Sequence, residues 1–380
     1  MIEKIHIQNF KSIYDLEIEV GRVNVFIGEN GSGKSNLLEA LVFVSASESN
    51  MLSNEFLFPR GMRVPEPELM RSAFFEEDRE KDIHINIELN GNIIKEFEFK
   101  NSNTEYSKWI EIENDTSIIM KMILENRPSQ NTKGLDKRTL EYLKQLEEKD
   151  ILRYEKMEKN KLTNFIIYSP EYEELRNFTD EGQIQPLGVK GEGLYKLLKV
   201  VNNYEDKTYI KTIIESLQLF DWFDDITIDK DLAFGEKKLT IKDKYLYKEI
   251  DQRSTNEGFL FILFYVTLIV AKETPKAFAI DNIDSFLNPK LCTKLMILVV
   301  ELAKKYDKQI FLTTHNPAIL DGINLNDEEQ KLFVVSRNDK GYTQIKNLTV
   351  EDNPIDEDGE RLHLSEAFLR GYLGGLPRGF

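Results

Sequence analysis

The 380-residue sequence contains one cysteine, Cys292, and therefore has no intramolecular disulfide. It also lacks a membrane-spanning run. The longest apolar stretch, residues 259–271, is interrupted by Thr267, and it is shorter than the roughly 20 residues that a span needs. Residues 1–4 do not begin a hydrophobic signal region. These absences exclude a secreted disulfide scaffold and a membrane protein, and they predict a cytoplasmic protein.

Basic residues are also in the minority. The 50 Lys and Arg residues face 66 Asp and Glu residues, which gives a formal charge of −16 at pH 7. Duplex binding relies on Lys and Arg to neutralise phosphates, so this balance argues against a protein that coats DNA, although a local basic groove stays open. The hydrophobic fraction of 41% is typical of a globular chain, and the length favours two or three structural units. The cysteine and the histidines show no metal-ligand spacing.

The first hundred residues contain strand-like alternation of apolar and polar residues. We expect strands at 5–7, 16–20 and Val23–Ile27, the last nearly continuous in apolar residues and therefore buried. Residues 83–99 alternate on both sides of Asn90-Gly91, a pair that favours the type I′ turn of a hairpin. The N-terminal part therefore predicts an antiparallel β-subdomain.

The middle and the C-terminal half differ in character. Residues 133–160 hold eight basic and seven acidic residues, with apolar residues at roughly helical spacing. A solvated, charged helical arm is the simpler interpretation, and an arm that contacts DNA or a partner is the alternative. Beyond it, strands alternate with helices, which predicts a parallel sheet covered on both faces. We expect strands near 165–169, 224–228, 238–242, 277–280, 310–313 and 332–335, and helices within 193–217, 258–272 and 290–305.

Residues 28–35, GENGSGKS, fit the pattern G-x-x-x-x-G-K-[ST] of a P-loop, and they follow a buried-type strand and open a helix, expected over residues 34–44. Glycines let backbone N–H groups converge on phosphate oxygens, and the N-terminus of the helix adds a favourable dipole. Lys34 would reach the β- and γ-phosphates of a nucleotide, and Ser35 would hold Mg²⁺. The predicted phosphate-binding residues are Asn30, Gly31, Ser32, Gly33, Lys34, Ser35 and Asn36.

Two later strands end in polar residues of the kind that such a site needs. The apolar run of residues 277–280 is followed by Asp281, which would bind Mg²⁺ through water. The strand that begins at Ile310 leads to His315. A histidine at the C-terminal end of a parallel strand lies beside the nucleotide crevice, where it could sense a γ-phosphate.

Together these motifs resemble the ABC-type ATPases of the RecF/SMC/OLD group, and in particular the stand-alone AAA-family ATPases of bacterial anti-phage defence operons. The resemblance covers residues 1–45 and 250–325 and leaves the middle of the chain without a motif. The segments that carry it are IQNFKS at 7–12, the P-loop with NLL at 36–38, Asp281 followed by LNP at 287–289, and THNP at 314–317.

The resemblance implies a role for each matching residue. Lys34 is the Walker A lysine, Ser35 and Asp281 hold the metal, and His315 is the switch histidine. Residues 256–258, Asn-Glu-Gly, stand where the family has its Ser-x-Gly signature, so Asn256 and Gly258 would cap the γ-phosphate bound by another protomer. The resemblance thus implies ATP and Mg²⁺ as cofactors and a head-to-tail homodimer or higher oligomer.

The implied architecture is an α/β P-loop NTPase, the ABC-type ATPase head, with an antiparallel β-subdomain and an inserted charged helical arm. We expect four parts along the chain. Residues 1–105 form the N-terminal half of the ATPase core, 106–164 the helical insertion, 165–345 the C-terminal half of the core, and 346–380 a tail. The tail is expected to begin as an acidic loop and to end as a docked helix over 368–380.

Three positions depart from the family pattern. Asn282 stands where the family has the glutamate that orients the attacking water, and losing a general base typically costs about 10²–10⁴-fold in rate. Asp284 is the nearest substitute carboxylate. No Gln occurs between Asn36 and Ser129, so the usual Q-loop glutamine is missing or displaced. Asn256 replaces the signature serine, a mild change because an amide still donates to phosphate.

Three functions compete. The first is a Mg²⁺-dependent ATPase, slow or partner-gated, that controls an effector protein encoded nearby, in anti-phage defence. The second is a nucleotide-locked scaffold in which Asn282 prevents hydrolysis and the ATP-bound dimer sequesters the effector. The third is a RecF-like DNA repair factor, against which the net charge counts. The sequence has no acidic or His cluster typical of a nuclease, so any such activity would belong to a partner.

Overall fold

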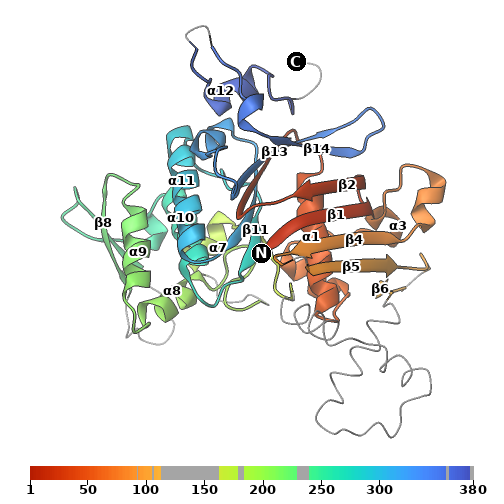
Figure 1. Cartoon of the computed structure of the whole chain (residues 1–380). Helices are drawn as coiled ribbons and strands as arrows, with labels where there is room; N and C mark the ends of the chain where they lie inside the picture. Colours follow the sequence, from red (N-terminus) through yellow and green to blue (C-terminus); the bar gives the residue numbers. More distant parts are fainter. Residues whose placement is uncertain are drawn as a thin grey trace, which may run out of the picture.

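The computed structural model describes residues 1–91, 93–104, 107–112, 162–178, 184–228, 239–356 and 359–376. Its N-terminal part is an antiparallel sheet, seen beside α1 in Figure 1. The sheet has the order β2-β1-β4-β5-β6. Its strands are β1 (Ile2–Phe10), β2 (Ile13–Glu19), β4 (Ile83–Leu89), β5 (Ile93–Lys100) and β6 (Ile110–Glu111).

This sheet confirms the predicted antiparallel β-subdomain and its hairpin, since β4 pairs with β5 in antiparallel register from Ile83–Phe99 to Leu89–Ile93. Strand β6 pairs with β5 and lies inside the segment that we assigned to the helical insertion, so the sheet continues into that segment. The charged residues 133–160 lie outside the described residues.

A six-stranded sheet at the centre of the molecule has the order β14-β13-β3-β12-β11-β7. Its strands are β3 (Val23–Ile27), β7 (Ile167–Tyr168), β11 (Ala277–Ile280), β12 (Gln309–Thr314), β13 (Gln330–Arg337) and β14 (Thr343–Leu348). All neighbours are parallel except the edge pair β13–β14. The parallel sheet is therefore confirmed, with one antiparallel edge strand added.

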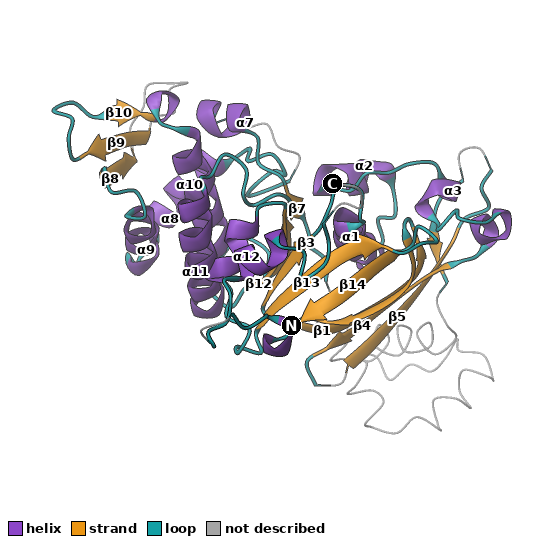
Figure 2. Cartoon of the chain, turned by 90° about the horizontal axis from the view of Figure 1, so that it is seen from above, coloured by secondary structure: helices purple, strands orange, loops and turns teal. Residues whose placement is uncertain are grey.

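The central sheet separates two apolar cores. On β12, Phe311 packs with α1 (Lys34–Glu48) and the N-terminal sheet, whereas Ile310 and Leu312 pack with the helices on the other face. This alternation follows from the two-residue period of a strand. Figure 2 shows α10 and α11 on the side of the central sheet that faces away from β1, β4 and β5. The helices are α7 (Tyr172–Asn177), α8 (Leu194–Asn202), α9 (Thr208–Leu217), α10 (Glu257–Val270) and α11 (Pro289–Lys305).

The helix starts have local causes. The Asn256 side chain accepts a hydrogen bond from the Phe259 N–H at 2.9 Å, and Asn288 accepts one from Leu291 N–H at 3.0 Å before Pro289. Both are N-caps that satisfy amides with no partner inside the helix. Among the described residues, no helix is long and apolar enough to cross a membrane.

Two expectations are wrong. The strands predicted near 224–228 and 238–242 do not join the parallel sheet: β8 (Phe223–Ile228) and β9 (Leu239–Asp243) form a separate antiparallel sheet with β10 (Ile250–Asp251). The predicted C-terminal helix lies earlier, as α12 (Leu364–Leu369), and residues 370–376 continue as turns in which Gly371, Gly374 and Gly375 have positive φ. These glycines favour turns over a helix.

The remaining α-helices of the described residues are short. They are α2 (Asn54–Leu57), followed by the 3₁₀ turn Phe58–Arg60, and α3 (Pro67–Met70). They lie between α1 and β4 and connect the P-loop helix to the N-terminal sheet.

Candidate functional site

The P-loop runs from the end of β3 to the start of α1. Its glycines Gly28, Gly31 and Gly33 have φ values of 159°, 78° and 107°, in the region that L side chains rarely adopt. A Cβ on Gly33 would lie 2.1 Å from Thr343 Oγ1, and one on Gly28 would lie 2.0 Å from the Val335 carbonyl. Glycine is thus required at both positions, for space as well as for conformation.

A chain of hydrogen bonds supports the loop from behind. Asn36 Nδ2 donates to Ser12 Oγ at 2.6 Å, and Ser12 Oγ lies 2.6 Å from Thr343 Oγ1. Thr343 Oγ1 in turn donates to the Ser32 carbonyl at 2.9 Å. The corner between β1 and β2 and the edge strand β14 therefore fix the P-loop in place.

Lys34 is the buried cation of the loop. Its Nζ donates to the carbonyls of Gly28 and Glu29, at 2.8 and 3.0 Å. Burial lowers the pKa of Lys34 to about 8, and the nearby carboxylates of Asp281 and Asp284 oppose that shift. Because these two hydrogen bonds go to backbone carbonyls, the ammonium is available to a charged ligand that enters the loop.

Ser35 and Asp281 lie next to each other. Ser35 Oγ donates to Asp281 Oδ1 at 3.5 Å, and the same oxygen accepts a hydrogen bond from Thr313 Oγ1 on β12. Asp281 directly follows β11, whose neighbours β7 and β12 fix its backbone; its N–H donates to the Tyr168 carbonyl at 2.8 Å. A hydroxyl and a half-buried carboxylate are hard oxygen donors of the kind that Mg²⁺ prefers.

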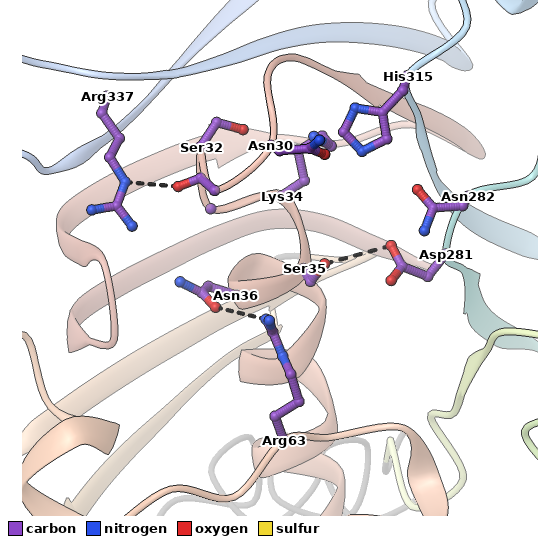
Figure 3. Close-up of a pocket in the computed structure, with 12 residues that line it drawn as sticks. Asn30, Ser32, Lys34, Ser35, Asn36, Arg63, Asp281, Asn282, His315 and Arg337 are labelled. Carbon is purple, nitrogen blue, oxygen red and sulfur yellow. Dashed lines mark hydrogen bonds between the residues drawn. The ribbon is translucent and has the colours of Figure 1, made fainter.

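These side chains surround one cavity of about 300 Å³, called the P-loop cavity below and shown in Figure 3. It contains an unsatisfied donor: Ser32 Oγ is buried and has no hydrogen-bond partner among the described residues. Such a group suits a phosphate oxygen. The lining residues are Asn30, Gly31, Ser32, Gly33, Lys34, Ser35, Asn36, Arg63, Asp281, Asn282, His315 and Arg337.

Three further predicted residues lie at or behind the cavity. Asn282 lines it and has φ of 56°, a left-handed conformation that asparagine tolerates better than most residues. His315 also lines it, and partial desolvation and the charge of Lys34 lower its pKa. Asp284 is not among the lining residues; its Oδ1 accepts from Thr314 Oγ1 at 2.6 Å and from His315 N–H at 3.4 Å. Asp284 thus holds the strand end that carries His315.

Two arginines were not found by sequence reasoning. Arg337 is at the end of β13, and its Nε donates to the Gly31 carbonyl at 2.7 Å. Its strand-end position is the signal that identified His315 and could have identified it too. Arg63 lies in a loop, and its guanidinium donates to Asn36 Oδ1 at 3.2 Å. No local sequence pattern identifies Arg63 as a residue of the site.

The structure does not bring the predicted signature residues into this cavity. Asn256 is exposed and caps α10, and Gly258 packs against Leu287 and the Phe286 carbonyl. Neither residue lines the P-loop cavity of its own chain. Asn256 therefore faces solvent, whereas Gly258 is buried at the start of α10.

Two larger pockets adjoin the P-loop cavity. The side pocket, of about 590 Å³, shares Asn36, Arg63 and Arg337 with it and has apolar walls. These walls include Val64, Pro65, Leu69 and Phe74. The second, the apolar pocket of about 520 Å³, shares Ser35, Arg63 and Asp281 with the P-loop cavity.

Comparison with known proteins agrees with this geometry. Residues 1–259, more than half of the chain, match the family described as "AAA ATPase domain". Residues 257–321 match a second family, "AAA domain, putative AbiEii toxin, Type IV TA system". A solved SMC head bound to the C-winged helix domain of ScpA superposes with a TM-score of 0.57 and 15% identity, over 92% of this chain and 98% of that chain. That likeness concerns the fold alone, and it confirms the predicted ABC-type ATPase head.

Curated relatives match only in part. An uncharacterized protein of Methanocaldococcus jannaschii is 34% identical over 113 residues, which are 28% of this chain and 50% of that protein. The DNA replication and repair protein RecF of Listeria welshimeri is 42% identical over 55 residues, 14% of this chain and 15% of RecF. The chain thus matches half or less of the length of these relatives.

Proposed function

Because this chain belongs to the family of AAA ATPase domains, we propose that it binds Mg²⁺ and ATP in the P-loop cavity and hydrolyses the ATP. One observation carries the proposal: Lys34, Ser35 and Asp281, drawn from two distant segments, line the same cavity. A lysine, a hydroxyl and a carboxylate in one phosphate-sized site are the groups that Mg²⁺·ATP requires. The apolar walls of the side pocket offer a place for the adenine base of ATP.

Several residues of the cavity then have a task. The Lys34 ammonium, the backbone N–H groups of the P-loop and the unsatisfied Ser32 hydroxyl bind phosphate oxygens. Ser35 and Asp281 would hold Mg²⁺, and Thr313 orients the Asp281 carboxylate. A Mg²⁺ ion held by Ser35 and Asp281 would supply positive charge that offsets the charge developing on the phosphate oxygens.

Hydrolysis also needs a group that activates water. Asp281 is the one carboxylate among the described residues that line the cavity, and Asn282 cannot take a proton as a carboxylate does. We propose that His315, largely neutral at pH 7 because its pKa is lowered, donates to the terminal phosphate or orients the water. Asp284 stays a candidate base, but its hydrogen bonds to Thr314 and His315 favour a positioning task.

Steady-state ATP turnover tests the proposal, with Lys34→Ala as the background. Mg²⁺-dependent turnover above that background supports an ATPase. If ATP does not bind to the wild-type chain at 1 mM or below, a typical upper range for such sites, the proposal is wrong.

We further propose that the site is completed by a second copy. Asn256 and Gly258 lie outside the cavity of their own chain, and Asn256 is exposed at the start of α10. In a head-to-tail dimer this helix start would face the partner's nucleotide. Light scattering with Mg²⁺ and a slowly hydrolysed ATP analogue checks this: a mass that stays monomeric contradicts it, and Asn256→Asp should weaken assembly through charge repulsion with phosphate.

A second candidate function is a nucleotide-locked scaffold that sequesters an effector, in anti-phage defence. It is favoured by Asn282 and by the lack of a second carboxylate among the described lining residues. Tight ATP binding with no turnover would support it.

A RecF-like repair function is the third candidate. The net charge of −16 counts against it, and ATP-dependent, salt-sensitive duplex binding would support it.

A further inference from the structure

Glu39 is a buried carboxylate in the second turn of α1, and the proposed function gives it no task. Its side chain is 1% exposed. One oxygen, Oε2, accepts from Lys11 Nζ at 2.6 Å; the other, Oε1, accepts from Arg63 Nε at 2.7 Å and from the Arg63 N–H at 3.1 Å. A buried carboxylate persists only when it is paired, and this one holds two cations.

Arg63 depends on that carboxylate for its position. Its side chain is 69% exposed and belongs to a loop outside helices and strands. Lys11 Nζ donates to the Arg63 carbonyl at 2.6 Å, so Glu39 and Lys11 fix its main chain while Glu39 also fixes its guanidinium. An arginine so exposed would otherwise sample many rotamers.

The Arg63 guanidinium lies where three pockets meet. Arg63 lines the P-loop cavity, the side pocket and the apolar pocket, and it donates to Asn36, two residues after Lys34. Glu39 contacts two cations at this point, Lys11 and Arg63. Glu39 raises the pKa of Arg63 through the hydrogen bond that joins them, so the guanidinium is charged at neutral pH.

We propose that Glu39 is a positioning residue for the nucleotide: it acts through Arg63, whose guanidinium it holds at the edge of the P-loop cavity to bind the phosphate chain. The inference rests on the proposed ATP binding and adds to it a residue that does not itself touch the ligand. Lys11 also fixes the loop of Arg63, by donating to the Arg63 carbonyl. Because Lys11 lies at the corner between β1 and β2 and also contacts Glu39, it links the N-terminal sheet to the P-loop helix.

A double-mutant cycle tests this. The dissociation constant of Mg²⁺·ATP is measured by calorimetry for the wild-type chain, Glu39→Gln, Arg63→Ala and the double variant. Arg63→Ala should weaken binding about tenfold, the order of one lost charged hydrogen bond, and Glu39→Gln about fivefold. Because Glu39 acts through Arg63, the double variant should bind within about twofold of Arg63→Ala. Losses that multiply overturn the proposal.

Glu48 provides a matched control. It lies on the same helix, is 6% exposed and pairs with Lys95, which is 8% exposed, but it does not line the P-loop cavity. Glu48→Gln should lower the thermal unfolding temperature and leave the ATP dissociation constant within about twofold of wild type, because the buried pair is lost far from the ligand. An equal loss of ATP affinity in Glu48→Gln shows a general effect on the helix and overturns the proposal.

Two further outcomes also decide for or against the proposal: a variant that does not fold, and a wild-type chain that does not bind ATP. If Glu39→Gln does not fold, Glu39→Asp retains the charge, and a smaller loss that is again not additive with Arg63→Ala supports the proposal. A wild-type chain that does not bind ATP overturns the proposed function and this inference together. Additive losses in a wild-type chain that does bind ATP overturn the positioning role of Glu39 alone.

Discussion

Ser35 and Asp281 are 246 positions apart in the chain, and their side-chain oxygens Oγ and Oδ1 lie 3.5 Å apart. The approach follows from strand order: β3 leads to Ser35, β11 leads to Asp281, and β12 lies between them in the central sheet. Carboxyl ends of parallel strands meet at one edge, so the residues that follow them share a site.

The first prediction concerns this pair. Asp281→Asn removes the charge that would hold the metal but keeps an acceptor for Thr313. We expect turnover to fall at least about 100-fold and Mg²⁺ to lose its effect on ATP affinity, because the amide is a poor Mg²⁺ ligand. Binding measured with Mg²⁺ and with EDTA checks this. Lys34→Ala is the contrast, since it should weaken binding under both conditions; a Mg²⁺ effect that survives in Asp281→Asn would contradict the assignment.

The second prediction concerns Asn282. Asn282→Glu supplies the missing carboxylate and should raise turnover by about 10²-fold if Asn282 is the brake. Its φ of 56° adds a cost of about 1 kcal/mol in the free energy of unfolding, since glutamate tolerates this conformation less well. Turnover and urea unfolding are measured together. Asn282→Gln shares the backbone cost without the carboxylate, so a similar gain in both variants would disprove the brake.

The third prediction concerns Gly33. An alanine there would carry its Cβ 2.1 Å from Thr343 Oγ1 and 2.8 Å from Ser12 Oγ, at a φ of 107°. We expect Gly33→Ala to disrupt the hydrogen bonds behind the loop and to weaken ATP binding at least about tenfold. Gly91→Ala is the control: its φ is 86° but no atom lies within 4 Å of the new Cβ, and it lies far from the loop in the β4–β5 turn. Equal ATP affinity in Gly33→Ala and wild type would contradict the expectation.

The fourth prediction concerns pH. Lys308 is buried, and its Nζ contacts the carbonyls of Ala271, Thr274 and Pro275 as well as Thr274 Oγ1. Burial lowers its pKa from 10.5 to about 8. The folded chain thus releases this proton near pH 8 and the unfolded chain near pH 10.5, so the unfolded state binds more protons in between. Stability contributed by Lys308 should therefore rise with pH across that window.

Urea unfolding of wild type and Lys308→Met at several pH values between 7 and 10.5 checks this prediction. Lys308→Met leaves buried carbonyls without a donor, at a cost of about 1–3 kcal/mol in the free energy of unfolding at pH 7. The difference between the two chains should grow above pH 8. Lys100→Met, at a lysine whose side chain is 64% exposed, should show no such growth. Parallel pH profiles for wild type and Lys308→Met would show that Lys308 does not titrate in this window.

Much of the site was predictable, because its residues follow strands or belong to a motif with a fixed local geometry. Three of its parts lie at the ends of parallel strands: the P-loop sequence, Asp281 and His315. Because ligands bind at the carboxyl ends of parallel strands, these parts are expected to share one site. Arg337 obeys the same rule and was missed only because the strand was not followed to its last residue. The parallel sheet itself was readable from apolar strands alternating with helices.

Other features depend on contacts that no local pattern encodes. Arg63 reaches the cavity through its contacts with Glu39 and Lys11, so that three separate segments meet there. The loop that contains Arg63 has no periodicity. The strands β8 and β9 look locally like those of the parallel sheet, and only their pairing with each other and with β10 distinguishes them. The tail was misread because apolar residues in it suggested a helix, whereas its glycines adopt positive φ.

The position of β3 has a consequence for synthesis. Val23 pairs with Ile310 on one side and with Gln330 on the other, so the P-loop strand has neither sheet neighbour until most of the chain has left the ribosome. At about 5–20 residues per second, that interval lasts on the order of 15–60 s. During it, an apolar strand with two open edges is exposed to other nascent chains. A fragment that ends near residue 105 would carry the entire phosphate-binding motif and still lack the sheet that shapes it.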